Sequence, residues 1–102
     1  MNRENSPLGQ AWRSHVTGRN EVALDEFEKI ASASPEDMDA LYGLGLAQRG
    51  AGKTDEAIAT FQRIMELLAQ QTTDDEDERN RLEMLRRMVH QQLVFLGVKN
   101  DV

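Results

Sequence analysis

The sequence contains two stretches that align without a gap: TGRNEVALDEFEKI at residues 17–30 and AGKTDEAIATFQRI at residues 51–64. They define a 34-residue period, and the aligned positions share a glycine, an alanine, a phenylalanine and an isoleucine. The identical pairs are Gly18 and Gly52, Ala23 and Ala57, Phe27 and Phe61, and Ile30 and Ile64. A fixed period of this length is typical of repeat proteins, in which each unit packs against its neighbours.

The same period explains a short stretch that otherwise suggests a nucleotide site. AQRGAGKT, residues 47–54, fits the loose pattern of a phosphate-binding loop, in which backbone N–H groups and a lysine contact the phosphates. In the alignment, however, its GKT is the second copy of GRN at residues 18–20. Both glycines are expected to end a helix with positive φ, and Asn20 and Thr54 are expected to cap the next helix. A phosphate-binding loop also needs a preceding strand, whereas the preceding residues have a helical pattern.

Composition excludes several kinds of site and partner. The 102-residue chain suits one modest domain, and its net charge of −6 disfavours general binding to nucleic acid. It has no cysteine, which excludes disulfides and thiolate metal sites, and its two histidines are far apart. No apolar run approaches the ~18 residues of a membrane span, and the N-terminus lacks the apolar core of a signal peptide. We therefore expect a cytoplasmic protein that uses no cofactor or metal and binds no nucleic acid or membrane.

Apolar spacing and cap signals predict five helices. In chain order they are expected at about residues 8–17, 20–31, 35–49, 54–70 and 76–96. Ser34 followed by Pro35 is a strong start signal, with Ser34 as the N-cap of the third helix. The apolar sides of the second and fourth helices are expected to consist of Val22, Ala23, Phe27 and Ile30, and of Ala57, Ile58, Phe61, Ile64, Met65 and Leu68.

A helix pair that recurs with this period resembles the tetratricopeptide repeat family. The residues at the family's signature positions are Leu41, Leu44, Gly45, Ala57 and Phe61 in the second copy, and Ala11, Ala23, Phe27 and Pro35 in the first. The small residues let paired helices approach closely, and the phenylalanines fill the space beside them. The chain departs from the family at Leu41 and Gln48, where Trp and Tyr are usual.

The resemblance implies an all-α fold of antiparallel helix–turn–helix repeats, an α-solenoid. We expect two repeats, at residues 8–34 and 35–71, followed by a C-terminal capping helix at residues 72–97. Residues 1–7 are expected to be a flexible N-terminus and residues 98–102 a tail.

The fifth helix does not keep the 34-residue period. Its Leu82, Leu85 and Val89 mimic Leu41, Leu44 and Gln48 in a 41-residue register. The fourth helix and its loop are therefore predicted to be lengthened by about two turns relative to the first repeat.

The resemblance also implies a concave surface, lined by the first helix of each pair. The residues that it places there are Leu8, Trp12 and His15, then Asp39, Tyr42, Leu46 and Arg49, and, with the shifted register, Asn80, Glu83, Arg87 and His90. Aromatic and Arg side chains are favoured anchors in protein interfaces. Two other interpretations stay open, namely that Trp12 covers the open end of a short core and that Arg49 is a solvated charge. Chaperone-binding members clamp carboxylates with Lys and Asn where this chain has Leu8 and Trp12, so that specificity is not expected.

The fifth helix carries two apolar stripes at helical spacing. The first consists of Leu82, Leu85, Val89, Leu93 and Leu96, and the second of Met84, Met88 and Phe95. One stripe is expected to pack on the fourth helix. The second either belongs to a wide face buried against that helix or forms an oligomer contact, for which flexible Met side chains are suited.

The function predicted from the sequence is a non-catalytic, tetratricopeptide-like adaptor that binds a partner protein or peptide. No nucleophile, base and orienting group converge recognisably, so no enzymatic activity is expected. The expected partner-binding residues are Trp12, His15, Asp39, Tyr42, Leu46, Arg49, Glu83 and Arg87. The alternatives are a structural homo-oligomer, such as a homodimer, through Met84, Met88 and Phe95, and a nucleotide binder through AQRGAGKT.

Overall fold

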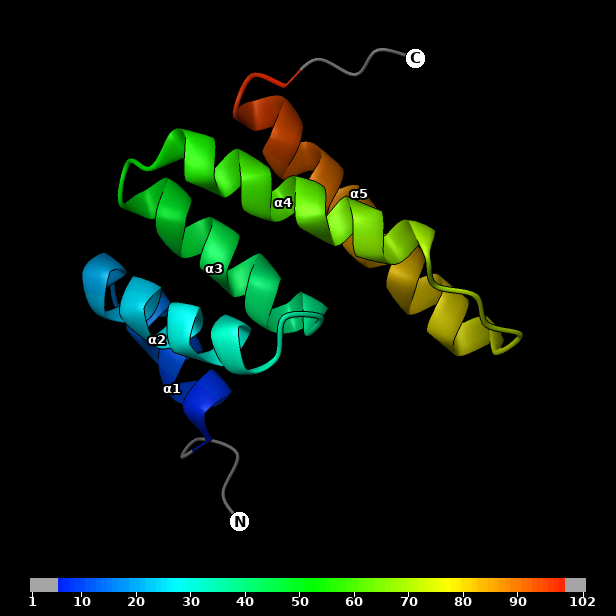
Figure 1. The fold of residues 1–102 in the computed structure, drawn as a ribbon, viewed down its shortest axis with the longest axis horizontal. Helices are drawn as coiled ribbons and strands as arrows, with labels where there is room; N and C mark the ends of the chain where they lie inside the picture. Colours follow the sequence, from blue (N-terminus) through cyan, green and yellow to red (C-terminus); the bar gives the residue numbers. More distant parts are fainter. Residues whose placement is uncertain (1–5, 99–102) are drawn as a thin grey trace.

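A computed structural model describes residues 6–98, which form five α-helices (Figure 1). They are α1 (Pro7–Val16), α2 (Asn20–Ala33), α3 (Met38–Gly50), α4 (Thr54–Ala69) and α5 (Glu76–Phe95). The predicted helices are confirmed, with small shifts at their ends. The predicted flexible N-terminus and the tail lie largely outside the described residues, and both stay predictions.

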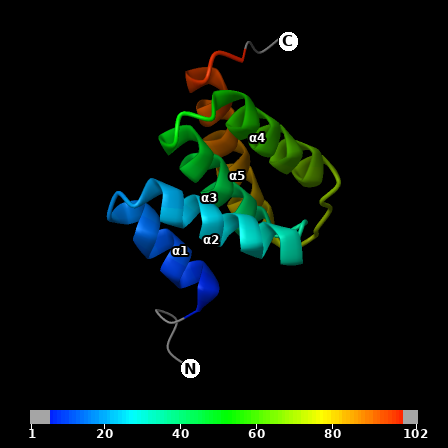
Figure 2. The same cartoon turned by 60° about the vertical axis from the view of Figure 1, so that its left-hand side comes forward.

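The helices pack in chain order. Each contacts the next one along the chain, and α1 also reaches α3, so that α1, α3 and α5 alternate with α2 and α4 (Figures 1 and 2). This arrangement confirms an all-α fold built from sequential helix–turn–helix pairs.

The helices α1, α3 and α5 end in the same hydrogen-bonded turn. In each turn a glycine has positive φ, namely 80° at Gly18, 78° at Gly52 and 93° at Gly97. The N–H of Gly52 donates to the Arg49 carbonyl (3.1 Å), and the next N–H, of Lys53, donates to the Gln48 carbonyl (2.8 Å). This pair of bonds is the Schellman motif, which favours glycine at the left-handed position. The prediction for the first two glycines is confirmed, and the same turn recurs after α5 at Gly97.

The starts of α2 and α4 correct the predicted caps. Arg19 and Lys53 occupy the N-cap positions, and neither makes a side-chain cap hydrogen bond. Asn20 and Thr54 are instead the first residues of the helices, because the Schellman turn leads directly from one helix into the next. The Asn20 side chain donates across to the carbonyl of Gly50 (3.3 Å), which joins the first turn to the end of α3.

The predicted start of α3 is also wrong. Asp37, not Ser34, is the N-cap, and its carboxylate accepts a hydrogen bond from the backbone N–H of Ala40 (3.1 Å). Ser34 closes α2, with its N–H donating to the Ile30 carbonyl (2.8 Å). A carboxylate at this position also interacts favourably with the positive end of the helix dipole, which explains why Asp37 takes the cap.

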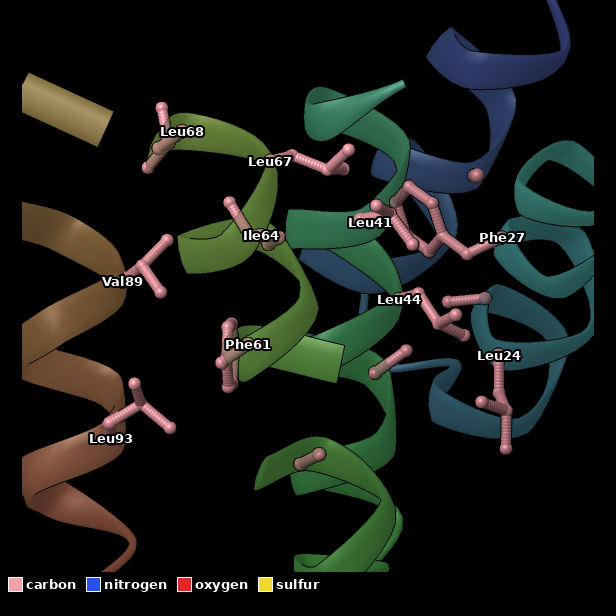
Figure 3. Close-up of a cluster of buried hydrophobic side chains, with 14 residues drawn as sticks. Leu24, Phe27, Leu41, Leu44, Phe61, Ile64, Leu67, Leu68, Val89 and Leu93 are labelled. Carbon is pink, nitrogen blue, oxygen red and sulfur yellow. The ribbon is translucent and has the colours of Figure 1, made fainter. Parts of the chain in front are cut away.

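The core lies between successive helices. In it, aromatic rings pack directly against the backbone at glycines of α3. A β-carbon on Gly45 would lie 2.6 Å from the Phe61 ring, and one on Gly43 would lie closer still to the ring of Phe27. Both phenylalanines are fully buried, and Phe27 points from α2 toward α3 (Figure 3). The expected close approach at Gly45 is confirmed. Val22, in contrast, is 48% exposed, because α2 buries Ala23, Leu24 and Phe27 instead.

A side-chain hydrogen bond repeats with the 34-residue period. In the first helix pair, the Ser14 hydroxyl donates to the Glu26 carboxylate (2.6 Å). In the second pair, at the equivalent positions, the Thr60 hydroxyl donates to the side-chain oxygen of Gln48 (2.6 Å). The donor is on the first helix in the first pair and on the second helix in the second pair, but in both pairs the bond joins the two helices. Buried Gln48, which replaces the family's usual Tyr, is thereby satisfied.

The first apolar stripe of α5 packs on α4. Val89 is fully buried, Leu93 is nearly so, and both point from α5 toward α4 (Figure 3). A 41-residue register would pair exposed Met84 and Met88 with buried Gly43 and Ala47 of α3. A 42-residue register instead pairs Val89 with Ala47 and fits the burial of both helices better. This register is longer than the predicted one by a single position, which is a rotation of about 100° around a helix.

The predicted lengthening of α4 and its loop by two turns is only partly correct. α4 has 16 residues and α2 has 14, so α4 gains two residues. The connection after α4 is also two residues longer than that after α2. In addition, α5 begins about one turn further ahead of its buried Val89 than α3 begins ahead of its buried Ala47. The extra residues are therefore distributed over α4, the connection after it and the first turn of α5.

Candidate functional site

The outward side of α3 carries the residues that the sequence placed on the binding surface. Tyr42 and Leu46 are half-buried against the core, and Asp39 is exposed. The Tyr42 ring meets Phe61 edge to face, with centroids 5.8 Å apart. Tyr42 is therefore held in place by the core while part of its ring still faces solvent.

Arg49 is partly exposed and is held in place by α5. Its Nη1 donates to the side-chain oxygen of Gln92 (2.7 Å), and its guanidinium carbon lies 3.7 Å from the centroid of the Phe95 ring. Within residues 6–98, no ion pair involves Arg49, whereas Arg63, Arg81, Arg86 and Arg87 all pair with glutamates. A guanidinium that is held by an amide and an aromatic face keeps donors available for a carboxylate.

The residues from α1 form a separate aromatic group. The Trp12 ring meets Phe27 edge to face (5.1 Å, 78°) and lies 6.0 Å from the His15 ring. Trp12 is partly buried and packs against the core, as expected if it covers the open end. Nδ1 of His15 is buried without a hydrogen-bond partner in the structure.

The second apolar stripe of α5 lies on the side next to α3. Phe95 contacts Arg49, and Arg81 and Leu85 line a hollow with residues 36–39 at the start of α3. The 42-residue register assigns Arg81, Met84, Met88 and Gln91 to the positions that Asp39, Tyr42, Leu46 and Arg49 have in α3. Met84 is 64% exposed, Met88 37% and Phe95 68%, which rules out the wide face buried against α4.

With this register, the predicted α5 residues Asn80, Glu83, Arg87 and His90 are not at those equivalent positions, and their role in binding stays a prediction. Glu83 lines a hollow of about 420 Å³ at the corner of α4 and α5, together with Leu68, Arg79 and Arg86. A complete third pair would place its second helix against this side of α5. The hydrogen bond from Arg86 holds the pKa of the Glu83 carboxyl below its usual value, and the charge of Arg87 adds to the effect.

Two surfaces that the sequence suggested separately thus adjoin. We name as the α3–α5 face the residues Tyr42, Leu46, Arg49, Met84, Met88 and Phe95. It combines aromatic rings, flexible Met side chains and one arginine without an acidic partner, a composition enriched at protein interfaces. Gln92, which orients Arg49, was not found from the sequence, because nothing in the repeat pattern distinguishes it. The binding role of all these residues, including those from α1, stays a prediction.

The AQRGAGKT stretch lies at the end of α3, in the Schellman turn, and at the start of α4. A helix therefore precedes the turn where a phosphate-binding loop would need a strand. The turn and the first residues of α4 line an open hollow of about 280 Å³, where Asp55 and Glu56 lie beside Lys53. These carboxylates repel phosphate, so the structure does not support the nucleotide interpretation.

Replacing Lys53 with alanine should leave the free energy of unfolding within about 0.5 kcal/mol of wild type, because the side chain is exposed. ATP should leave the melting temperature of both proteins unchanged, because only a ligand that binds the folded state raises it. Differential scanning fluorimetry with and without Mg-ATP measures both effects. A rise that appears in wild type and disappears in the variant would restore the nucleotide site.

Within residues 6–98, no helix is both long and apolar enough to cross a membrane. Over the same residues, no three His, Asp or Glu side chains are grouped so that they could hold a metal ion.

Comparison with known proteins gives the family. A model of the tetratricopeptide repeat matches residues 16–72, more than half of the chain. A search of curated proteins and a search of solved structures returned no match. The matched segment contains α2, α3 and α4 with their turns, which carry the 34-residue period. The chain therefore belongs to the tetratricopeptide repeat family.

Proposed function

We propose that this chain is a non-catalytic interaction module that binds a segment of a partner protein on the α3 part of its α3–α5 face, at Tyr42, Leu46 and Arg49. Members of the family are generally protein–protein interaction modules, and they present the first helices of their pairs on a concave side. Among the described residues, α3 and α5 are two such helices. The lack of cysteine is consistent with a protein that functions in the reducing cytoplasm.

The observation that carries the proposal is that Arg49 is held by contacts with Gln92 and Phe95 of α5. Its guanidinium is oriented by Gln92 and Phe95 before any partner arrives, so little side-chain entropy is lost on binding. Tyr42, seated on Phe61, is similarly ordered. A partner segment with an apolar residue next to a carboxylate matches this pair of anchors, because the carboxylate can bond to the guanidinium while the apolar side chain packs on the rings.

The proposal predicts that truncating an anchor weakens partner binding. Peptides selected from a displayed random library on the immobilised chain should lose about 2 kcal/mol of affinity, roughly 30-fold, in Tyr42→Ala and in Arg49→Ala. Arg49→Lys should also weaken binding, because lysine keeps the charge but lacks the planar fork. Isothermal titration calorimetry measures these affinities, and circular dichroism confirms that each variant stays helical.

Two matched controls locate the site. Lys29→Ala on α2 and Arg63→Ala on α4 also remove an exposed cation, but from helices outside the α3–α5 face. Both should bind the selected peptides as wild type does. Peptides that lose affinity to the control variants, and not to the Tyr42 and Arg49 variants, would place the binding site on the α2–α4 side and contradict the proposal.

A further inference from the structure

The exposed stripe of α5 has the spacing of a helix–helix seam. Met84, Met88, Gln91 and Phe95 follow one another at alternating intervals of four, three and four positions. This alternation is the one by which two helices interlock side chains in a coiled coil. Three of the four side chains are apolar and exposed, so the chain itself leaves the seam uncovered.

The surroundings of this stripe carry little charge. Residues 88–98 contain no Asp, Glu, Lys or Arg. The charged residues between Met84 and Phe95 are Arg86 and Arg87, and both already pair with Glu83 of the same chain. Such a helix surface fits a partner surface of the same kind, because α5 brings no unpaired charge of its own to the contact. Arg49 of α3 lies at its edge against Phe95, where Gln92 already accepts a hydrogen bond from it.

The seam also matches the same seam on a second, antiparallel copy of α5. Its four positions are symmetric about the point between residues 89 and 90, so an antiparallel copy sets Met84 opposite Phe95 and Met88 opposite Gln91. A symmetric dimer needs this property, because the same patch must serve both copies. The contact between Met and Phe is favourable, since sulfur packs well against an aromatic ring. A parallel copy would instead bring the acidic first turn, Glu76–Asp77–Glu78, against its own duplicate.

We propose that a second copy of this chain covers the stripe, and that the two chains form a symmetric dimer through antiparallel α5 helices. α5 spans Glu76–Phe95, and with the symmetry point between residues 89 and 90 the two copies overlap over positions 84–95, about 18 Å of helix. A contact this short is small for a stable interface, so association should be weak, with a dissociation constant on the order of 10 μM.

Sedimentation velocity of the purified chain, from about 1 to 200 μM, tests the dimer against the expected dissociation constant. Wild type should pass from monomer to dimer over this range. Met88→Glu should stay monomeric, because two glutamates would be brought together next to the symmetry axis and lose their solvation. Val22→Glu, which places the same charge at an exposed valine of α2, should dimerise as wild type does. A wild type that is monomeric throughout the range would overturn the proposal.

Two measurements keep this result separate from other failures. Circular dichroism should show unchanged helix content in Met88→Glu, so that a lost dimer is not a lost fold. Because the assay contains only this chain, its outcome does not depend on the proposed partner segment. A dimer that persists in Met88→Glu, with the fold intact, would place the contact elsewhere and overturn the proposal.

The orientation can be tested by cross-linking, because the chain has no cysteine of its own. In the antiparallel dimer, position 84 of one copy lies about 16 Å along the paired helices from position 84 of the other, too far for a disulfide. Under oxidation, Met84→Cys alone should therefore remain uncross-linked. A mixture of Met84→Cys and Phe95→Cys should form the mixed disulfide. Rapid cross-linking of Met84→Cys to itself would overturn the antiparallel arrangement.

Discussion

Replacing Phe61 with alanine should lower the free energy of unfolding by about 3–5 kcal/mol, the range for removing a buried aromatic ring. The ring is fully buried, sits against Gly45 of α3 and supports the Tyr42 ring. Its removal leaves a cavity in the interface between α3 and α4, which is also the scaffold of the α3–α5 face. Urea denaturation followed by circular dichroism measures the change, read from the midpoint at constant slope.

A valine on the surface provides the comparison for this variant. Val22→Ala removes apolar atoms from a half-exposed side chain and should change the free energy of unfolding by no more than about 0.5 kcal/mol. A small domain has about 5–15 kcal/mol in total, so the Phe61 variant should unfold at a clearly lower urea concentration. Equal midpoints for the two variants would show that α3 and α4 are not paired through this ring.

Replacing Gly45 with leucine should destabilise the fold by about 1–3 kcal/mol or more, because the side chain has no space. The first carbon alone would lie 2.6 Å from the Phe61 ring, so the two helices must separate or the ring must move. This cost outweighs the gain of up to ~1 kcal/mol in intrinsic helix propensity when leucine replaces glycine. Ala59→Leu, at an exposed position of α4, adds a similar volume and should have little effect.

The two substitutions should also be coupled. In the double variant, the leucine at position 45 can occupy part of the space that the Phe61 ring leaves. The loss of stability should therefore be smaller than the sum of the two single losses, with an interaction energy of about 0.5–3 kcal/mol. A double-mutant cycle from the four urea curves gives this energy. Strict additivity would mean that position 45 and the ring do not touch.

Much of the fold could be predicted from the sequence, because residues 34 positions apart occupy equivalent places in the two helix pairs. Ala23 and Ala57, like Phe27 and Phe61, are buried at equivalent positions, and the glycines of the turns have the expected positive φ. The contact of Phe27 with Gly43 could not be predicted in the same way. It joins the first pair to the second, and the aligned stretches carry no information about what lies between pairs.

The candidate site was predicted less well than the fold, for a geometric reason. On α3, where the period holds, the named residues are partly or fully exposed, and their binding role stays a prediction. On α5 the inserted residues leave the register undetermined by one position, and an error of one position turns the helix by about 100°. The 42-residue register puts Met84 and Met88, in place of Glu83 and Arg87, at the positions equivalent to Tyr42 and Leu46, and the binding role of all of them stays a prediction. Exposure of Met84 and Met88 supports this register, and only the structure provides it.

The order in which the helices pack also bears on how quickly the chain folds. Each helix contacts its neighbour in the sequence, and among the described residues only α1 and α3 make a substantial contact across an intervening helix. Few long loops must close before native contacts form, and topologies of this kind fold in microseconds to milliseconds. Apolar side chains of the core, such as Phe27 and Phe61, are then exposed only briefly as the chain folds, which limits misassociation of incompletely folded chains.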